Sequence, residues 1–471
     1  MRKTLFSIVL ILLGVSGKAQ FTNLHNFPTA GGYSSLTYVN GVLYGTVNSG
    51  GTNNVGYIYS MNSNGTSFTV LYNFVGDASF PCGSLLYDNG TLYGMTSQGD
   101  GVNTGGGTIY KLNIDGSGYA ILHSFTYQNP NDGFSPQNSL IILGNTLYGM
   151  TRKGGAVFPE IGGEGTIFKI NTDGSNFSIL HSFAYGEENP YGSLLLSGNY
   201  LYGMTSTYSS NTNAGKIFKI NVDGTGYVIL YNFNGADGAK PNGSLVISGN
   251  TLYGMTALGG NTFTGIRKGN VFKINTDGSG FQSIYNDLNG STNYTWSYGS
   301  LVLVGNVLFG KSNVNLYSLN TDGSNYQWYN WGGYGSTTGS FDPMENGNLT
   351  FGGGVLYGVN NRFGGDSGGG VIYKFAPSTL GVDSNNSIEN LIEIYPNPTN
   401  DNIIIDFRSE VSINNYNVKI YTMLGQEVLN SIINQEQQSI SLNSLCGKGI
   451  YLVKIFNDSN SLIASKKIML K

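Results

Sequence analysis

Short apolar stretches alternate with turns rich in glycine, asparagine and aspartate along most of the chain. Four such stretches follow one another at residues 191–198, 200–205, 215–222 and 227–233. Apolar runs of this length, bounded by Gly, Asn and Asp, predict β-strands, and we name these four a, b, c and d. Because no sustained helical periodicity occurs between Phe21 and Phe375, we expect an all-β fold.

The four-strand pattern recurs along the chain, and its clearest mark is the signature Leu-Tyr-Gly in strand b. The signature begins at Leu43, Leu92, Leu147, Leu201, Leu252, Leu308 (as Leu-Phe-Gly) and Leu356, at intervals of 48 to 56 residues. A period of about 50 residues is typical of a propeller or a solenoid. Strands c and d are joined by Asp-Gly turns, as at residues 171–176, and this pair favours a hairpin because it accepts positive φ.

The two ends of the repeat region complement each other. Residues 21–27 read as a strand d ahead of the first unit, and the seventh unit stops after its strand c at residues 370–376. The N-terminal strand can fill this gap and close a ring, which removes exposed sheet edges. We therefore predict a seven-bladed β-propeller over residues 20–377, closed by the N-terminal strand. An open solenoid is the alternative, but it leaves the complementary ends unexplained.

The repeat resembles the GloVer-type tandem repeat family of bacterial secreted proteins. The resemblance rests on LYGMT, a Gly-rich gap, IFKINTDG and ILHSF, and it extends over all seven units. It supports the propeller. Because the family is defined by its sequence and not by an activity, the resemblance implies no particular chemistry.

The N-terminus has the pattern of a secretory signal peptide. Arg2 and Lys3 precede an apolar core at residues 5–15, and Gly17 to Ala19 fit a cleavage site, so we expect the signal peptide to span residues 1–19. No other segment is apolar enough to cross a membrane, so we expect no integral membrane span.

A second module follows the repeats. Residues 378–390 are polar and read as a linker, and residues 391–471 contain apolar runs at 402–407, 417–423, 438–443 and 449–456 without the Leu-Tyr-Gly signature. About 80 residues of this kind are typical of a small β-sandwich.

This module closely resembles the type A C-terminal sorting domain of the type IX secretion system. Four motifs stand in order, namely IYPNPTND, VKIYTMLGQEV, GIYLVKI and the basic end KKIMLK. The resemblance implies recognition by an outer-membrane translocon, removal of the domain, and release of the propeller or its attachment to surface lipopolysaccharide. It thus implies passage through the periplasm to the outer-membrane surface or the extracellular space. The motif residues are Tyr395, Pro396, Asn397, Pro398, Gly425, Gly449, Tyr451, Lys466 and Lys467.

The composition narrows the classes of function. Charged residues make up only 11% of the chain, 71 residues are glycine, and the formal net charge is -4. A nucleic-acid partner is not expected, because such binding needs a basic surface. The two cysteines, Cys82 and Cys446, fall in different predicted domains, and we interpret them as small apolar side chains and not as a disulfide.

The sequence offers no recognisable catalytic group. The three histidines, His25, His123 and His181, occupy one place in strand d where other units have tyrosine, which indicates packing and not proton transfer. No Ser/His/Asp set and no zinc spacing occur. The Asn-x-Asp-Gly turns carry one carboxylate each, too few for a usual calcium loop, so we interpret them as hairpin turns, with calcium as the alternative. We identify no catalytic residue and expect no metal and no cofactor.

Candidate ligand-binding residues lie in the long connections. The b–c and d–a connections vary in length and share one face of the predicted propeller, whereas the a–b and c–d turns are short and uniform. Such variation is typical of a binding surface, although drift of unconstrained loops would produce it too. Arginines suit bidentate binding of anions, and aromatic rings suit sugars or partner proteins. The candidates are Arg152, Arg267, Arg362, Phe134, Tyr191, Trp296, Tyr298 and Phe363.

Three functions remain open, and we favour the first. The protein is a non-enzymatic, secreted or surface-exposed module that binds a glycan or a protein. The second possibility is a polysaccharide-acting hydrolase or lyase, and the third is a structural or adhesion component of the surface. The enzyme would use acids of the long connections, such as Asp132, Glu160, Glu164, Glu187 and Asp237.

Overall fold

The computed structural model is built almost wholly of β-strands, and the all-β prediction is confirmed. It describes residues 20–27, 35–76, 78–99, 105–127, 129–155, 163–184, 189–206, 214–259, 269–286, 299–311, 315–330, 348–360, 370–377, 392–395, 399, 401–407, 416–422, 427–435, 437–443, 445, 449–456 and 462–470. Within these residues the one helical element is the 3₁₀-helix η1 (Pro130–Asp132). The chain divides into two compact units, one of Ala19–Phe375 and one that contains Ala376–Lys471. The predicted signal peptide and linker lie outside the described residues.

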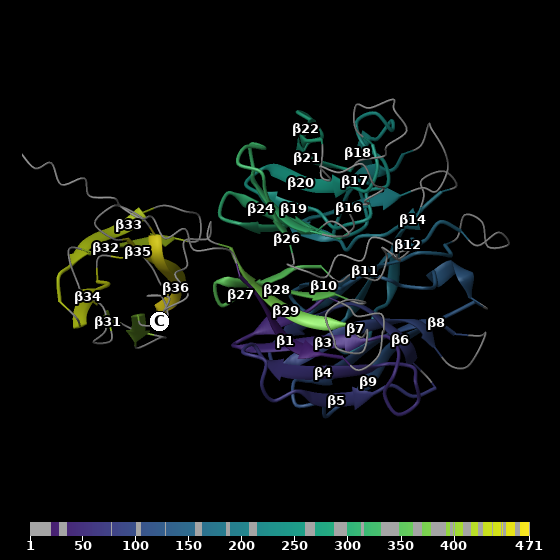
Figure 1. Cartoon of the computed structure of the whole chain (residues 1–471), viewed down its shortest axis with the longest axis horizontal. Helices are drawn as coiled ribbons and strands as arrows, with labels where there is room; N and C mark the ends of the chain where they lie inside the picture. Colours follow the sequence, from purple (N-terminus) through teal and green to yellow (C-terminus); the bar gives the residue numbers. More distant parts are fainter. Residues whose placement is uncertain are drawn as a thin grey trace, which may run out of the picture. The chain divides into compact units, whose positions relative to one another are not determined.

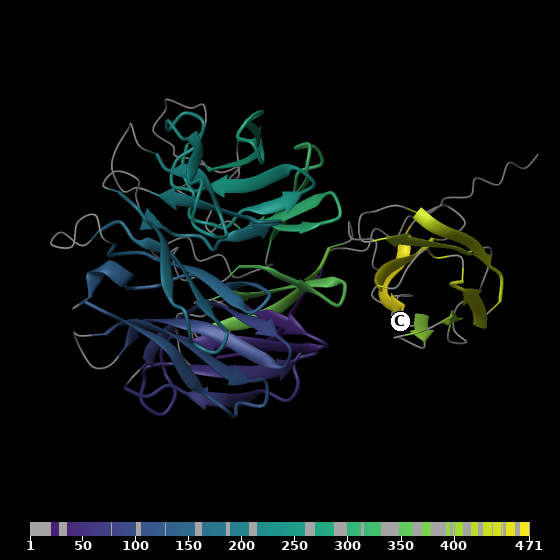
Figure 2. The same ribbon diagram turned by 180° about the vertical axis from the view of Figure 1, so that it is seen from behind.

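The repeat region forms seven antiparallel sheets in which strands a to d follow in hairpin order (Figure 1, and from behind Figure 2). Unit one contains β2 (Thr37–Val39), β3 (Val42–Val47), β4 (Tyr57–Asn62) and β5 (Thr69–Asn73). Unit two contains β6 (Ala78–Asp88), β7 (Thr91–Gly99), β8 (Gly105–Asn113) and β9 (Ala120–Thr126). Unit three contains β10 (Ile141–Leu143), β11 (Thr146–Thr151), β12 (Thr166–Asn171) and β13 (Ser178–Ser182).

Units four to six repeat this order. Unit four contains β15 (Leu195–Ser197), β16 (Tyr200–Ser206), β17 (Lys216–Asn221) and β18 (Val228–Asn232), and the short β14 (Asn189–Pro190) also pairs with β16. Unit five contains β19 (Val246–Ser248), β20 (Thr251–Thr256), β21 (Asn270–Asn275) and β22 (Gln282–Tyr285). Unit six contains β23 (Val302–Val304), β24 (Val307–Lys311), β25 (Asn315–Asn320) and β26 (Gln327–Asn330).

The seventh sheet joins the two ends of the repeat region. Its strands β27 (Thr350–Gly352), β28 (Val355–Asn360) and β29 (Val371–Ala376) belong to unit seven, and its fourth strand is β1 (Gln20–Asn26), which pairs with β29. The amide of Phe27 donates to the carbonyl of Gly370 over 2.8 Å. The N-terminal segment therefore supplies strand d of unit seven, as the complementary ends predict.

The apolar core lies between successive units. At the junction of units three and four, Tyr148 and Met150 of one strand b pack with Leu194 and Leu201 of the next unit, and all four are nearly inaccessible to solvent. Because side chains alternate along a strand, leucine of the signature faces the preceding unit while tyrosine and methionine face the following one. The same arrangement joins unit seven to unit one, where Tyr357 and Val359 pack with Leu36, Leu43 and Phe27, the residue that follows β1.

The glycine of the signature makes room for an aromatic ring of strand c. In unit four, a Cβ at Gly203 would lie 2.3 Å from Cζ of Phe218, which is fully buried. A side chain at this position would displace the ring. The same pairing occurs in every unit, as Gly45–Tyr59, Gly94–Tyr110, Gly149–Phe168, Gly203–Phe218, Gly254–Phe272, Gly310–Tyr317 and Gly358–Tyr373.

Hydrogen bonds between residues in or just before the strands a link six pairs of neighbouring units. The amide of Ser139 donates to Ser193 Oγ over 3.0 Å, and the amide of Ser193 donates to Ser244 Oγ over 2.8 Å. The series continues from unit seven into unit one, where the amide of Asn348 donates to Ser35 Oγ over 2.7 Å. The other members are the amides of Ser84, Ser244 and Ser300, which donate to the side chains of Ser139, Ser300 and Asn348.

Aromatic stacks join the outer strands d to the c–d turns of the following units. His123 of β9 stacks on Phe177 with ring centroids 3.7 Å apart, and His181 of β13 stacks on Tyr227 at the same distance. Tyrosine takes the place of histidine in Tyr72–Tyr119, Tyr231–Phe281 and Tyr285–Tyr326. His25 of β1 stacks on Phe68 of unit one at 4.1 Å. The histidines therefore pack against neighbouring units, as the sequence indicates.

The c–d turns are stabilised by their aspartates. In unit four, Thr225 donates to Asp223 Oδ1 from its backbone amide (2.9 Å) and its hydroxyl (2.7 Å). These bonds favour the carboxylate and lower its pKa. Gly224 follows with φ of +93°, a conformation that glycine adopts without strain. Asp115, Asp173, Asp277 and Asp322 make the same pair of bonds in their turns.

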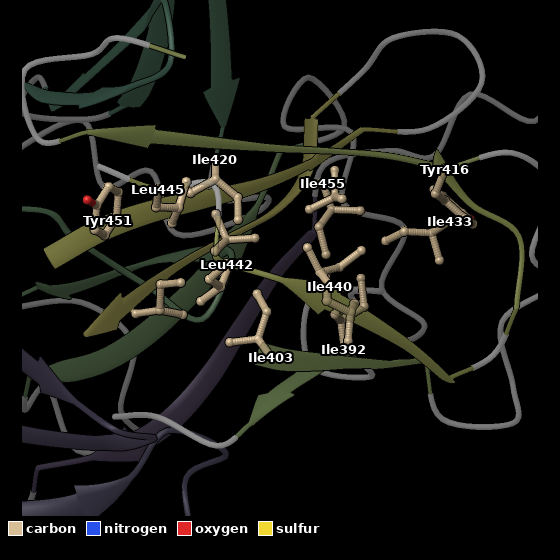
Figure 3. Close-up of a cluster of buried hydrophobic side chains, with 14 of the residues drawn as sticks. Ile392, Ile403, Tyr416, Ile420, Ile433, Ile440, Leu442, Leu445, Tyr451 and Ile455 are labelled. Atoms are coloured by element: carbon tan, nitrogen blue, oxygen red, sulfur yellow. The ribbon is translucent and has the colours of Figure 1, made fainter. Parts of the chain in front are cut away.

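The C-terminal unit consists of two sheets that share one core. The first contains β30 (Ile392–Tyr395), β31 (Asn402–Phe407) and β34 (Gln437–Ser441). The second has the order β33 (Glu427–Ile433), β32 (Tyr416–Thr422), β35 (Gly449–Phe456), β36 (Leu462–Leu470). Figure 3 shows Ile403 and Ile440 of the first sheet with Ile420 and Ile455 of the second in one apolar cluster.

The sorting-motif residues serve the packing of this unit where the structure describes them. Tyr395 ends β30, and its hydroxyl donates to Asp406 Oδ2 over 3.0 Å. Gly449 begins β35 and Tyr451 is buried in it. Lys466 and Lys467 belong to β36, which pairs along its length with β35, so the basic end of the chain is a strand. Pro396, Asn397, Pro398 and Gly425 lie outside the described residues.

Candidate ligand-binding face of the repeat region

The structure describes three of the eight candidate ligand-binding residues, and it brings them together. Arg152 begins the b–c connection of unit three, and Phe134 and Tyr191 lie on either side of it in the chain segments that contact it. The other five, Arg267, Arg362, Trp296, Tyr298 and Phe363, lie outside the described residues, as do Glu160 and Glu187 among the candidate acids.

Backbone hydrogen bonds fasten the connection from unit two to unit three onto the b–c connection of unit three. The amide of Phe134 donates to the carbonyl of Lys153 over 2.8 Å, and the amide of Lys153 donates to the carbonyl of Phe134 over 3.1 Å. The amide of Arg152 donates to the carbonyl of Ser135 over 3.2 Å. The Phe134 ring packs against Tyr127, with centroids 4.8 Å apart. Unit five has the same bridge between Ala239 and Leu258.

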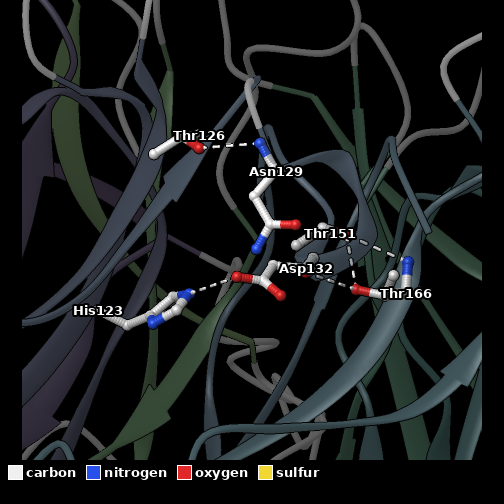
Figure 4. A network of polar contacts seen from close by, with 6 residues as sticks. All are labelled: His123, Thr126, Asn129, Asp132, Thr151 and Thr166. Carbon is white, nitrogen blue, oxygen red and sulfur yellow. Dashed lines mark hydrogen bonds and ion pairs between the residues drawn. The ribbon is translucent and has the colours of Figure 1, made fainter. Parts of the chain in front are cut away.

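A buried pair of threonines anchors this arrangement to the sheet. The hydroxyls of Thr151 and Thr166 lie 2.8 Å apart at the end of the b–c hairpin. The hydroxyl of Thr166 also donates to the carbonyl of Asp132 over 3.4 Å (Figure 4). Further along, the amides of Gly154 and Gly165 donate to the carbonyls of Gly163 and Gly154, each over 2.9 Å. The described parts of these connections are therefore fixed by main-chain and threonine contacts that leave most side chains free to vary.

Arg152 reaches across from unit three to unit four. Its Nη2 donates to the hydroxyl of Tyr191 over 2.5 Å, and its guanidinium carbon lies 4.7 Å from the centroid of the Tyr191 ring. Its Nε is buried and has no acceptor within the described residues. Arg152 itself is partly exposed, and it forms no ion pair with any carboxylate in the part of the chain that the structure describes. The site thus presents a positive charge against a neutral aromatic ring.

Two of the candidate acids are engaged by strand d of the preceding unit. Asp132 Oδ2 lies 3.9 Å from Nε2 of His123 (Figure 4). Burial lowers the pKa of His123, and Asp132 partly opposes that shift. Asp237 accepts from the hydroxyl of Tyr231 over 2.7 Å and from the amide of Asn234 over 2.9 Å.

Asp237 thus holds its d–a connection against the outer strand, and Asp132 lies beside the outer strand at the equivalent place, an arrangement that was not predicted from the sequence. The spacing Asp-Gly-x-x-Pro, present at residues 132–136 and 237–241, is the signal that marks it. Glu164 is the third candidate acid that the structure describes, and burial raises its pKa.

Within the described residues, no three His, Cys, Asp or Glu side chains gather in a way that could hold a metal ion. The described part of the chain also has no helix that is long and apolar enough to cross a membrane.

Comparison with protein families supports both resemblances. The Gloeobacter/Verrucomicrobia repeat matches twice in tandem, at residues 10–159 and 157–315. The secretion system C-terminal sorting domain matches residues 393–471. The latter is the sorting signal of the type IX secretion system, and the protein is therefore located outside the cell or at the outer-membrane surface. A comparison with curated protein sequences gives no match.

Solved structures with similar folds are distant in sequence. A fungal alcohol oxidase of the AA5 family in complex with copper is 11% identical with a TM-score of 0.52, over 96% of this chain and 99% of the oxidase. PorZ of Porphyromonas gingivalis, a surface component of the type IX secretion system, is 15% identical with a TM-score of 0.47, over 95% of this chain. This chain spans 60% of the length of PorZ. At these identities the likeness concerns the fold alone.

Proposed function

Because the chain belongs to the Gloeobacter/Verrucomicrobia repeat family and ends in a type IX sorting domain, we propose that it is an exported β-propeller that binds a glycan or a protein without catalysis. The propeller has seven blades and is closed by β1. Its ligand binds on the face formed by the b–c and d–a connections. The segments of the precursor are a signal peptide (1–19), the propeller (20–377), a linker (378–390) and the sorting domain (391–471).

The closed ring is supported by the junction between units seven and one. This junction has the same three kinds of contact as the junction of units three and four: an apolar cluster, an aromatic stack and an amide-to-serine hydrogen bond. An open solenoid would leave the outer surfaces of its first and last units without such partners.

The binding role rests on one observation above all. In unit three, main-chain hydrogen bonds fix the d–a and b–c connections to each other, so side chains that are not part of the repeat stand on a rigid base. Rigid scaffolds that carry variable connections are common binding surfaces. Unconstrained loops that merely drifted in sequence would not need the Phe134–Lys153 and Ala239–Leu258 bridges.

The geometry gives less support to a glycan hydrolase or lyase. A glycan hydrolase needs two acids free to act on the substrate, whereas the Asp237 carboxylate already accepts bonds from Tyr231 and Asn234. Asp132 faces His123, which is itself stacked on Phe177.

A binding screen with the purified protein tests the proposal. We expect the protein to bind some of the glycans, or a surface protein, without releasing cleavage products. Replacement of several b–c connections by the short b–c connection of unit six should abolish ligand binding. The midpoint temperature of thermal unfolding should stay unchanged. Turnover of a bound polysaccharide would establish the enzyme instead. Absence of any ligand would favour a structural component of the surface.

A further inference from the structure

We propose that Arg152 and Tyr191 form a subsite for the carboxylate of an acidic sugar. The inference rests on the proposed function, since it places one part of a ligand on the binding face described above. It names the chemical class of that ligand, a glycan that contains uronic acid.

Arg152 is a departure from the repeat. It follows the threonine that ends strand b, and the other units carry small or neutral residues at this place, namely Asn48, Ser97, Ser206, Ala257, Asn313 and Asn361. The contacts that hold units together therefore do not require an arginine here. In unit five, Ala257 occupies the equivalent position and its amide donates to the carbonyl of Lys240 over 2.9 Å, as that of Arg152 donates to Ser135.

The charge of Arg152 is not balanced by the described residues around it. A partly buried guanidinium loses hydration, and a neutral phenol replaces only part of that interaction. Glu164 is on the same connection, but burial raises its pKa, which is opposite to the effect of a nearby guanidinium. A bound anion would balance the charge that the described residues leave unbalanced.

The neighbourhood suits a sugar carboxylate. A guanidinium binds a carboxylate with two parallel hydrogen bonds, and its single charge matches that of one carboxylate. Tyr191 holds the guanidinium in place through both its hydroxyl and its ring. The chain beside Arg152 continues as Ser135, Pro136 and Gln137, whose serine and amide side chains are neutral groups that can bond to sugar hydroxyls.

The subsite lies where two units meet. Tyr191 stands two residues before Ser193, a member of the hydrogen-bond series, and Gly192 between them lies so close to Gly243 that its Cβ would be 2.0 Å from the carbonyl oxygen. The backbone that carries Tyr191 is thus held tightly. This position favours a defined binding geometry over a loose charge attraction.

Calorimetry with uronic acid oligosaccharides tests the proposal. The probes are oligomers of galacturonate, glucuronate and guluronate, each with its methyl ester as a neutral counterpart. We expect at least one acid to bind, and its ester to bind about tenfold more weakly or worse. Two substitutions install the residues that unit five has at these places: Arg152→Ala (as Ala257) and Tyr191→Asn (as Asn242). Each should lower the affinity for the acidic oligosaccharide about tenfold or more.

The matched control is Lys153→Ala, which removes an exposed positive charge from the adjacent position and should leave affinity within about twofold. Thermal unfolding of each variant establishes that it is folded. Failure of every acid to bind, equal affinity for acid and ester, or unchanged affinity in both Arg152→Ala and Tyr191→Asn would overturn the subsite. If the protein binds another glycan or a protein and Arg152→Ala has no effect, the proposed function stands without this subsite.

Discussion

The amide of Asn348 donates a hydrogen bond of 2.7 Å to the hydroxyl oxygen of Ser35, although the two residues are 313 positions apart in the sequence. The bond has the same form as that from the amide of Ser139 to Ser193 Oγ, which joins two consecutive units. If the propeller is closed, the two serines have equivalent roles.

Ser35→Ala and Ser193→Ala should therefore destabilise the protein to a similar degree. Each substitution leaves a main-chain amide without its acceptor, which costs about 1–3 kcal/mol. Urea unfolding of the two variants and the wild type measures the difference. A neutral effect of Ser35→Ala beside a destabilising Ser193→Ala would indicate an open array.

Gly203→Ala should lower the free energy of unfolding by about 1–3 kcal/mol, because the new methyl group overlaps the ring of Phe218. Gly76→Ala is the control, since nothing lies within 4 Å of the added Cβ at that position. Combining Gly203→Ala with Phe218→Leu should cost less than the sum of the two single changes. Strict additivity in this double-mutant cycle would contradict the proposed overlap.

The stability of the protein should decrease as the pH falls from neutral towards 5. Burial lowers the pKa of His25 and of His123, so between the folded and unfolded pKa values the unfolded chain binds more protons. His123→Tyr installs the residue found at Tyr72 and Tyr231 and should reduce this pH dependence. Urea unfolding at several pH values checks the result, and an unchanged slope in the variant would argue against a contribution from His123.

Calcium should leave the thermal midpoint unchanged. The Asp223 Oδ1 atom already accepts two hydrogen bonds from Thr225, and the equivalent aspartates do the same in their turns. Differential scanning fluorimetry with excess calcium and with EDTA tests this expectation. A clear stabilisation by calcium that is lost in Asp223→Ala would instead support a metal site in these turns.

The repeat units were predictable because their signals are local. Leu-Tyr-Gly, the Asp-Gly turns and the strand d that stands before unit one each lie within a few residues, and the pairing of β1 with β29 follows from their complementarity. In the C-terminal unit the prediction found β31, β32, β34 and β35 but not β30, β33 and β36. The last of these contains the pair Lys466 and Lys467, whose charge hides the strand pattern.

The candidate site was predictable only in part. Arg152, Phe134 and Tyr191 stood out as residue types in long connections, yet their proximity depends on how unit three meets unit four. Asp132 likewise lies near His123, and Asp237 bonds to Tyr231, but the two pairs are separated by different numbers of residues in the sequence. Contacts of this kind depend on the path of each connection, which no periodic pattern specifies.

The pairing of β1 with β29 also sets an order of events in folding. The first strand of the repeat region has to wait for the last, since its partner Val371–Ala376 is some 350 residues away in the chain. Until that partner is available, residues 20–26 remain an unpaired edge that can join foreign strands. A chain that ends before unit seven lacks β29, so its β1 has no partner strand and its last sheet cannot form.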